Sequence, residues 1–211
     1  MRRLLVVAAA LAIGGSVIPR IPEAQNMTTQ IDISRMDLGL TPDGFTFWRT
    51  GDGEVGDWRV MEDPSASDRQ VIAQTSKGPT DYRSPLAVYR PISAKNVDVV
   101  LRFKPVGGTV DQADGIVVRL VGSNALEDNV RFYRMVKGKR EQLDGANIIV
   151  TSNEWHTLGL RAEDDRFTIS FDGHELFSTV DSTFIGPGKV GLWTKADSVT
   201  NFDSISITPL E

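Results

Sequence analysis

The acidic residues of the chain lack the spacing that paired-carboxylate catalysis needs. Alternate side chains of a strand share a face, so a pattern such as E-x-D-x-E brings two glutamates together as acid and nucleophile for retaining cleavage of a sugar linkage. This spacing does not occur in the sequence. Glu127-Asp128 and Glu163-Asp164-Asp165 are adjacent acids that point to alternate faces or lie in turns. We interpret them as solvated loop acids.

Oxygen ligands are concentrated in the loop that runs TGDGEVGD. Asp52, Glu54 and Asp57 offer three carboxylates on a flexible, glycine-rich backbone. Carboxylate oxygens coordinate calcium readily, and extracellular calcium sites can be weak. The loop lacks the twelve-residue layout of an EF-hand, and the alternative is an ordinary turn. The sequence predicts at most a calcium site here and no other cofactor. Asp111, Asp114 and Asp203 are weaker candidate ligands.

Histidine and cysteine offer little catalytic chemistry. His156 and His174 are the 2 histidines, too few for a zinc site without several carboxylates. No G-x-S-x-G elbow supports a serine triad through His156. The chain has 0 cysteines, which excludes thiolate metal sites, a cysteine nucleophile and disulfides.

Sugar binding requires aromatic faces for the CH surfaces of the rings and planar polar groups for the hydroxyls. Several strand residues have the parity to point away from a core, opposite apolar neighbours such as Val118, Val130 and Val190. The alternative is that Trp193 packs between two sheets and the basic residues are ordinary surface groups. The candidates are Arg119, Arg131, Tyr133, Trp193 and Lys195 on strands, and Tyr82 and Arg83 at the rim.

The elements that must position these residues are short strands. About a dozen strand-like runs occur, the clearest at 97–103, where Val97, Val99, Leu101 and Phe103 alternate with more polar residues. Between Trp155 and Ile207, four more runs are separated by turn residues. Asp172-Gly173 joins two of them and predicts a tight hairpin, because both residues tolerate positive φ. Other predicted strands lie at 45–48, 58–61, 70–75, 86–89, 116–120, 130–136 and 148–151.

One region allows a second interpretation. The segment 123–143 has fair helix propensity around Ala125-Leu126-Glu127, but β-forming residues at 130–136 and the interrupting Gly138 favour strands. We therefore predict one all-β domain made of two packed antiparallel sheets, a sandwich or jelly roll.

The C-terminal motifs extend this prediction. The order W-H-T-L, R-F-T-I-S-F-D-G and G-K-V-G-L-W-T-K-A-D resembles the concanavalin A-like jelly-roll superfamily, above all its LamG-like and DUF1080-type exported bacterial proteins. The resemblance runs from about Phe45 to Ile207. It implies a role in carbohydrate binding or a 3-keto-disaccharide hydrolase (family 16 glycoside hydrolase-like) activity. The run with an aromatic pair that follows the G-I-V-V-R strand in this family is missing after Arg119, which predicts a lost strand or part of one.

The N-terminus resembles a secretory signal. Arg2 and Arg3 precede the apolar run 4–13, which is short for a membrane span, and a cut after Ala24 makes 1–24 a signal peptide. An uncleaved N-terminal anchor is the alternative. Cleavage leaves 25–211 as one domain with an extended lead-in at 26–40. It would remove Arg2, Arg3, Arg20 and Glu23, leaving 23 − 3 = 20 basic and 28 − 1 = 27 acidic residues.

An acidic balance without a long basic run disfavours nucleic acid and anionic membranes as partners. We expect an exported monomer, periplasmic or extracellular, with no membrane span in the mature form. Because catalytic spacing is absent and a strand is predicted to be lost, binding of a glycan or oligosaccharide through a concave sheet face is favoured over hydrolysis. A structural or adhesive envelope domain is the third alternative.

Overall fold

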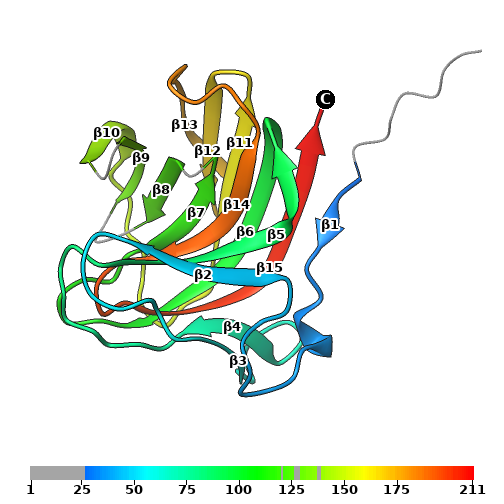
Figure 1. Ribbon diagram of the computed structural model, residues 1–211, viewed down its shortest axis with the longest axis vertical. Helices are drawn as coiled ribbons and strands as arrows, with labels where there is room; N and C mark the ends of the chain where they lie inside the picture. The colour runs from blue at the N-terminus through cyan, green and yellow to red at the C-terminus, as the bar shows by residue number, and fades with distance from the viewer. Residues whose placement is uncertain (1–26, 120, 126–128, 137–138) are drawn as a thin grey trace, which may run out of the picture.

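The fold is built almost entirely from strands. The computed structural model describes residues 27–119, 121–125, 129–136 and 139–211. Within these ranges the regular elements are β-strands and η1, a 3₁₀ turn at Ile33–Arg35. The strands form two antiparallel sheets that pack face to face (Figure 1). The predicted all-β sandwich is therefore confirmed. None of the described residues belongs to a helix long and apolar enough to cross a membrane.

The first sheet has eight strands, in the order β13-β12-β11-β6-β15-β4-β3, with the short β1 beside β15. Its bounds are β1 Thr29–Gln30, β3 Trp58–Glu62, β4 Gln70–Gln74, β6 Asn96–Gly107, β11 His156–Glu163, β12 Arg166–Phe171, β13 His174–Val180 and β15 Val199–Leu210. The long pair β6 and β15 forms its centre (Figure 1).

The second sheet has seven strands, in the order β10-β9-β8-β7-β14-β5-β2. Its bounds are β2 Phe45–Thr50, β5 Ser84–Ala94, β7 Asp114–Val118, β8 Val121–Ala125, β9 Val130–Val136, β10 Lys139–Ala146 and β14 Gly188–Thr194. Its edge strands are β10 and β2, and β14 lies near its middle (Figure 1).

The main core lies between the two sheets and follows the strand alternation. In β6, Val97, Val99, Leu101 and Phe103 are buried in this core, as their spacing predicts. The facing sheet supplies every second residue of β7, β9 and β14 among others. These are Ile116, Val118, Val130, Phe132, Val190 and Leu192.

The predicted hairpin at Asp172-Gly173 is confirmed. These two residues link β12 to β13, and Phe171 pairs with His174 across the turn. Their φ angles are 47° and 81°, both in the left-handed region. Such angles suit the right-handed twist of a two-residue hairpin.

Four expectations about the elements need correction or completion. The segment predicted as a strand at 148–151 has no regular structure, whereas the polar run Lys139–Ala146 forms β10 by pairing with β9. The sheet is continuous after Arg119, because β8 pairs with both β7 and β9, and the strand loss relative to the resembled family stays a prediction. The lead-in at 26–40 is partly packed, since β1 pairs with β15 and Ile33 is buried. The signal peptide predicted at 1–24 lies outside the described residues.

Candidate functional site

A second apolar cluster lies on the outer face of the seven-stranded sheet, the face that turns away from the eight-stranded sheet. Trp48 pairs with Leu86, and Leu86 pairs with Trp193, so the three form a row across β2, β5 and β14. In the next row, Val88 and Val117 flank Gly191. The buried members of this outer cluster are Leu86, Val88, Ala113, Val117 and Trp193. Their neighbours along each strand face the main core, so both faces of this sheet are apolar near β14.

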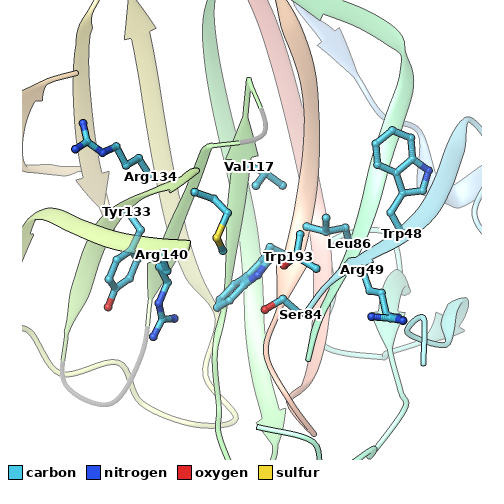
Figure 2. A pocket seen from close by; sticks show the side chains of 11 residues that line it. Trp48, Arg49, Ser84, Leu86, Val117, Tyr133, Arg134, Arg140 and Trp193 are labelled. Atoms are coloured by element: carbon cyan, nitrogen blue, oxygen red, sulfur yellow. The ribbon is translucent and has the colours of Figure 1, made fainter. Parts of the chain in front are cut away.

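A cavity of about 220 Å³ opens over this cluster (Figure 2). Its lining comes from β2, β5, β7, β14, β9 and β10, including both edge strands. In a flat seven-stranded sheet those edges would be about 29 Å apart. The outer face must therefore curl around the cavity, as a concave sheet does. The lining residues are Trp48, Arg49, Thr50, Ser84, Leu86, Val117, Tyr133, Arg134, Met135, Arg140 and Trp193.

Tyr133 and Arg140 form one wall of the cavity. The guanidinium carbon of Arg140 lies 4.6 Å from the centre of the Tyr133 ring, within range of a cation–π contact. In Figure 2 these two side chains lie together on one side of Trp193, while Trp48 and Arg49 lie on the other. An aromatic floor is thus flanked by aromatic and cationic groups.

The third arginine of the lining is neutralised by carboxylates. Arg134 Nη2 lies 2.7 Å from Glu141, and its Nη1 lies 3.3 Å from Asp181 and 3.0 Å from the Thr183 hydroxyl. The hydrogen bonds with Glu141 are the main reason that the pKa of Arg134 is raised. Figure 2 shows its guanidinium turned away from Trp193. Arg134 therefore braces the rim.

Two of the predicted ligand-binding residues line this cavity, and the placement expected for the others is corrected. Trp193 and Tyr133 are there, and Trp193 packs on the outer face, not between the sheets. Arg131 lies on the same strand as Tyr133, but its guanidinium bonds the Ala146 carbonyl at 2.7 Å and the Asn147 side chain. Its side chain crosses Gly145, where a Cβ would overlap it.

Arg83 and Arg119 are buried and serve the fold. Arg83 donates to the carbonyls of Glu54 and Ala196 at 2.8 and 2.6 Å, and to the Ser76 hydroxyl at 2.8 Å. Arg119 donates to the carbonyls of Lys95, Asp164 and Phe184. Burial lowers the pKa of both guanidinium groups. Their donors are occupied by backbone oxygens, so neither side chain is on an open face.

The two remaining candidates lie in loops outside the cavity lining. Lys195 Nζ is ion-paired with Asp81 at 3.0 Å and with Asp111. Tyr82 is 78% exposed, beside Asp81. These contacts stabilise the loop after β14 against the loop before β5.

The carboxylates predicted to bind calcium do not converge. Asp57 contacts Arg59 and accepts a hydrogen bond from Thr75 at 3.1 Å, and the Glu54 backbone accepts from Arg83. Within the described residues, no group of three or more His, Cys, Asp or Glu side chains could hold a metal ion. Of the weaker candidates, Asp203 is paired with Arg102 and Asp111 with Lys195.

Asp114 is fully buried between the sheets, directly behind the cavity. Its Oδ2 accepts a hydrogen bond from the Thr200 hydroxyl at 3.1 Å, which joins β7 to β15. Its Oδ1 has no hydrogen-bond partner among the described residues. Burial raises the pKa of this carboxyl well above its usual range. Asp114 pairs across the strands with Thr194, the residue after Trp193.

Sequence reasoning missed Trp48, Arg49 and Arg140. Trp48 carried a usable signal, because Phe45 and Phe47 pack toward the main core and alternation then places Trp48 outward. Arg140 carried none, because β10 has no apolar alternation and its position depends on pairing with β9.

These features define a two-sheet antiparallel sandwich of the jelly-roll type, with a cavity on the outer face of the seven-stranded sheet. The chain matches no protein-family model and no curated protein. It is similar in fold to carbohydrate-binding module CBM66 from Bacillus subtilis, with a TM-score of 0.60 and 18% identity over 79% of this chain and 97% of that one. A family 16 endo-glucanase from Bacteroides ovatus gives a TM-score of 0.59 and 13% identity over 85% and 99% of the two chains.

A third solved structure is domain 4 of AbnA, an extracellular arabinanase from Geobacillus stearothermophilus, in complex with arabinotriose. Its TM-score is 0.55, with 12% identity over 85% of this chain and 90% of that one. Identities this low establish a shared fold. They carry no site residue from one protein to another.

Proposed function

We propose that the chain binds carbohydrate on the outer face of the seven-stranded sheet. The observation that carries the proposal is the cavity in which Trp193 forms part of an apolar floor and Trp48 and Tyr133 lie on either side. Sugar rings present CH faces that stack on aromatic rings, and the nearby Thr50, Ser84 and Tyr133 hydroxyls are suitable partners for sugar hydroxyls. The similar structures named above include a carbohydrate-binding module and a domain bound to arabinotriose, which supports the same class of ligand.

The proposal is for binding. None of the lining residues is an Asp, a Glu or a His, so the cavity lining offers no carboxylate pair for acid and nucleophile. The prediction of a 3-keto-disaccharide hydrolase, and the finer resemblance to LamG-like and DUF1080-type proteins, draw no support from this lining. Export to the periplasm or the exterior remains part of the proposal, since it rests on the N-terminal sequence.

Retention of the protein in gels that contain soluble polysaccharides tests the proposal. Trp48→Ala removes a side chain that is 48% exposed, and Tyr133→Ala removes the opposite wall. Each substitution should weaken binding by about 1–2 kcal/mol, or roughly five- to thirtyfold, by loss of stacking area. Melting temperatures of the variants should stay near that of the parent for Trp48→Ala.

Trp155→Ala is a matched control on the outer face of the other sheet. The Trp155 ring is covered by Arg102 at 4.3 Å and Lys104 at 4.9 Å, and its indole NH donates to Ser65 at 3.0 Å. Its replacement should leave retention unchanged. Two outcomes would show that the cavity does not bind sugar. In the first, all three variants are retained as strongly as the parent protein on every glycan. In the second, Trp155→Ala loses as much retention as the two cavity variants.

A further inference from the structure

The charges that line the cavity are all of one sign. Among the residues that the structure describes, three arginines and no acidic residue line it, although the whole chain carries 28 acidic against 23 basic residues. Arg134 is neutralised by Glu141 and Asp181, so Arg49 and Arg140 are the lining cations that can attract an anion. The polar groups of the described lining other than these arginines are the hydroxyls of Thr50, Ser84 and Tyr133, which can bond the hydroxyls of any sugar and carry no charge.

Two of these arginines have no carboxylate within ion-pair distance among the described residues. Arg49 donates to the backbone carbonyl of Gly51, and Arg140 has only its contact with the Tyr133 ring. By contrast, many exposed cations elsewhere are paired. Examples are Arg35 with Asp32, Arg59 with Asp57, Arg69 with Glu62, Lys95 with Asp164 and Arg161 with Glu163.

The contact with the Tyr133 ring orients the Arg140 guanidinium in the absence of a ligand. A guanidinium that stacks on a ring keeps its N–H donors free at the edge of its plane, in the fork that matches a carboxylate. The ring contact also limits the rotamers that Arg140 must give up on binding. In Figure 2 the Arg140 side chain lies on the side of Tyr133 that faces Trp193, and both residues line the cavity.

We propose that this cavity binds an acidic glycan, with a uronate carboxylate on Arg140 and the sugar ring in the cavity between Tyr133 and Trp48. This inference rests on the proposed carbohydrate-binding function and names its ligand class. A uronic acid combines the two features that the cavity matches, an apolar ring face and a planar anion. Arg49 on the opposite rim would bind the carboxylate of a second uronate unit in the same glycan.

The test compares two ligands that differ in the charge of their carboxyl groups and in the methyl groups of the ester. Oligogalacturonate and its fully methyl-esterified form have the same rings and linkages, and alginate and hyaluronan oligosaccharides extend the acidic set. Titration calorimetry with the full chain in 20 mM and 200 mM NaCl measures each affinity. We expect the acidic member of the pair to bind at least about tenfold more tightly in low salt, as one charge-assisted contact of about 1.4 kcal/mol gives.

Arg140→Gln is the informative variant, and Arg166→Gln on β12 of the other sheet is its control. Arg140→Gln should remove the preference for the acidic ligand and most of its salt dependence, while Arg166→Gln should change neither. Unchanged melting temperatures establish that both variants fold.

The outcomes separate the two proposals. Equal binding of ester and acid would overturn the acidic-glycan inference and leave carbohydrate binding intact. Binding of no glycan, neutral or acidic, would overturn both proposals. Dextran sulfate or single-stranded DNA that binds as tightly as the uronates, with the same dependence on Arg140, would show recognition of bare charge and would overturn the uronate assignment.

Discussion

The buried carboxyl of Asp114 gives the protein a pH-dependent stability that one substitution can isolate. Burial raises the pKa of Asp114 well above its usual range of about 4, whereas in the unfolded chain it titrates normally. Between those two values the native state holds a proton that the unfolded state has released. The free energy of unfolding must then fall as pH rises. Asp114→Asn, which is neutral at every pH, removes this loss.

The magnitude follows from one proton. While Asp114 is protonated in the native state and ionised in the unfolded state, the wild type loses about 1.4 kcal/mol per pH unit relative to Asp114→Asn. The Asn side chain keeps the same shape, and its oxygen can still accept from the Thr200 hydroxyl, which lies 3.1 Å from Asp114 Oδ2 in the wild type. The loss should begin near pH 4 and level off above the native pKa.

Urea unfolding of both proteins at pH 4, 5, 6 and 7 measures the difference. Other groups, such as Asp63 and Asp197, change stability with pH in the opposite direction, but they are present in both proteins and cancel in the difference. Asp114→Ala is a second variant, expected to be less stable at every pH because it leaves a cavity and an unpaired Thr200 hydroxyl. A difference between wild type and Asp114→Asn that stays constant from pH 4 to 7 would refute the reasoning.

Two further predictions concern the loops around the cavity floor. Arg83→Lys should lower the free energy of unfolding by about 2–3 kcal/mol, or the melting temperature by roughly 4–12 °C. The reason is that one ammonium group cannot reach Glu54, Ala196 and Ser76 together. An unchanged melting curve would contradict this. Burial acts to raise the pKa of Asp197, but hydrogen bonds from Thr109, Asp111 and Val110 outweigh it and lower the pKa overall. Asp197 therefore contributes stability above about pH 4 that is lost as pH falls. Asp197→Asn should be less stable than wild type at pH 7, with the gap closing toward pH 2 in chemical unfolding; a gap independent of pH would exclude this role.

The fold could be predicted from the sequence where strand alternation and turn chemistry agree. Val97 to Phe103 alternates because one face of β6 is in the main core, and Asp172-Gly173 permits the positive φ that its hairpin requires. The polar strand β10 could not be predicted, because its residues are placed by hydrogen bonding to β9 and not by burial. The same reasoning explains the wrong strand at 148–151, where apolar residues pack on the core without joining a sheet.

The aromatic residues Trp193 and Tyr133 of the candidate site could be predicted from the sequence, but its arginines could not. Parity correctly placed Trp193 and Tyr133 on the outer face, since their neighbours Leu192 and Phe132 belong to the main core. Parity could not separate one arginine from another. The fate of a guanidinium depends on which carbonyls surround it, and those of Arg119 come from segments up to 65 residues away.

Arginine donors therefore give the sharper criterion for function in this fold. Arg83 and Arg119 have their donors occupied by backbone carbonyls, and Arg134 has two acidic partners. Replacing any of these would damage structure before it altered binding. Arg140 is exposed, stacked on Tyr133 and directed along the cavity wall, so its loss should cost little stability. Within the part of the chain that the structure describes, no group accepts from the Arg140 guanidinium, so its donors remain available to a ligand in the cavity.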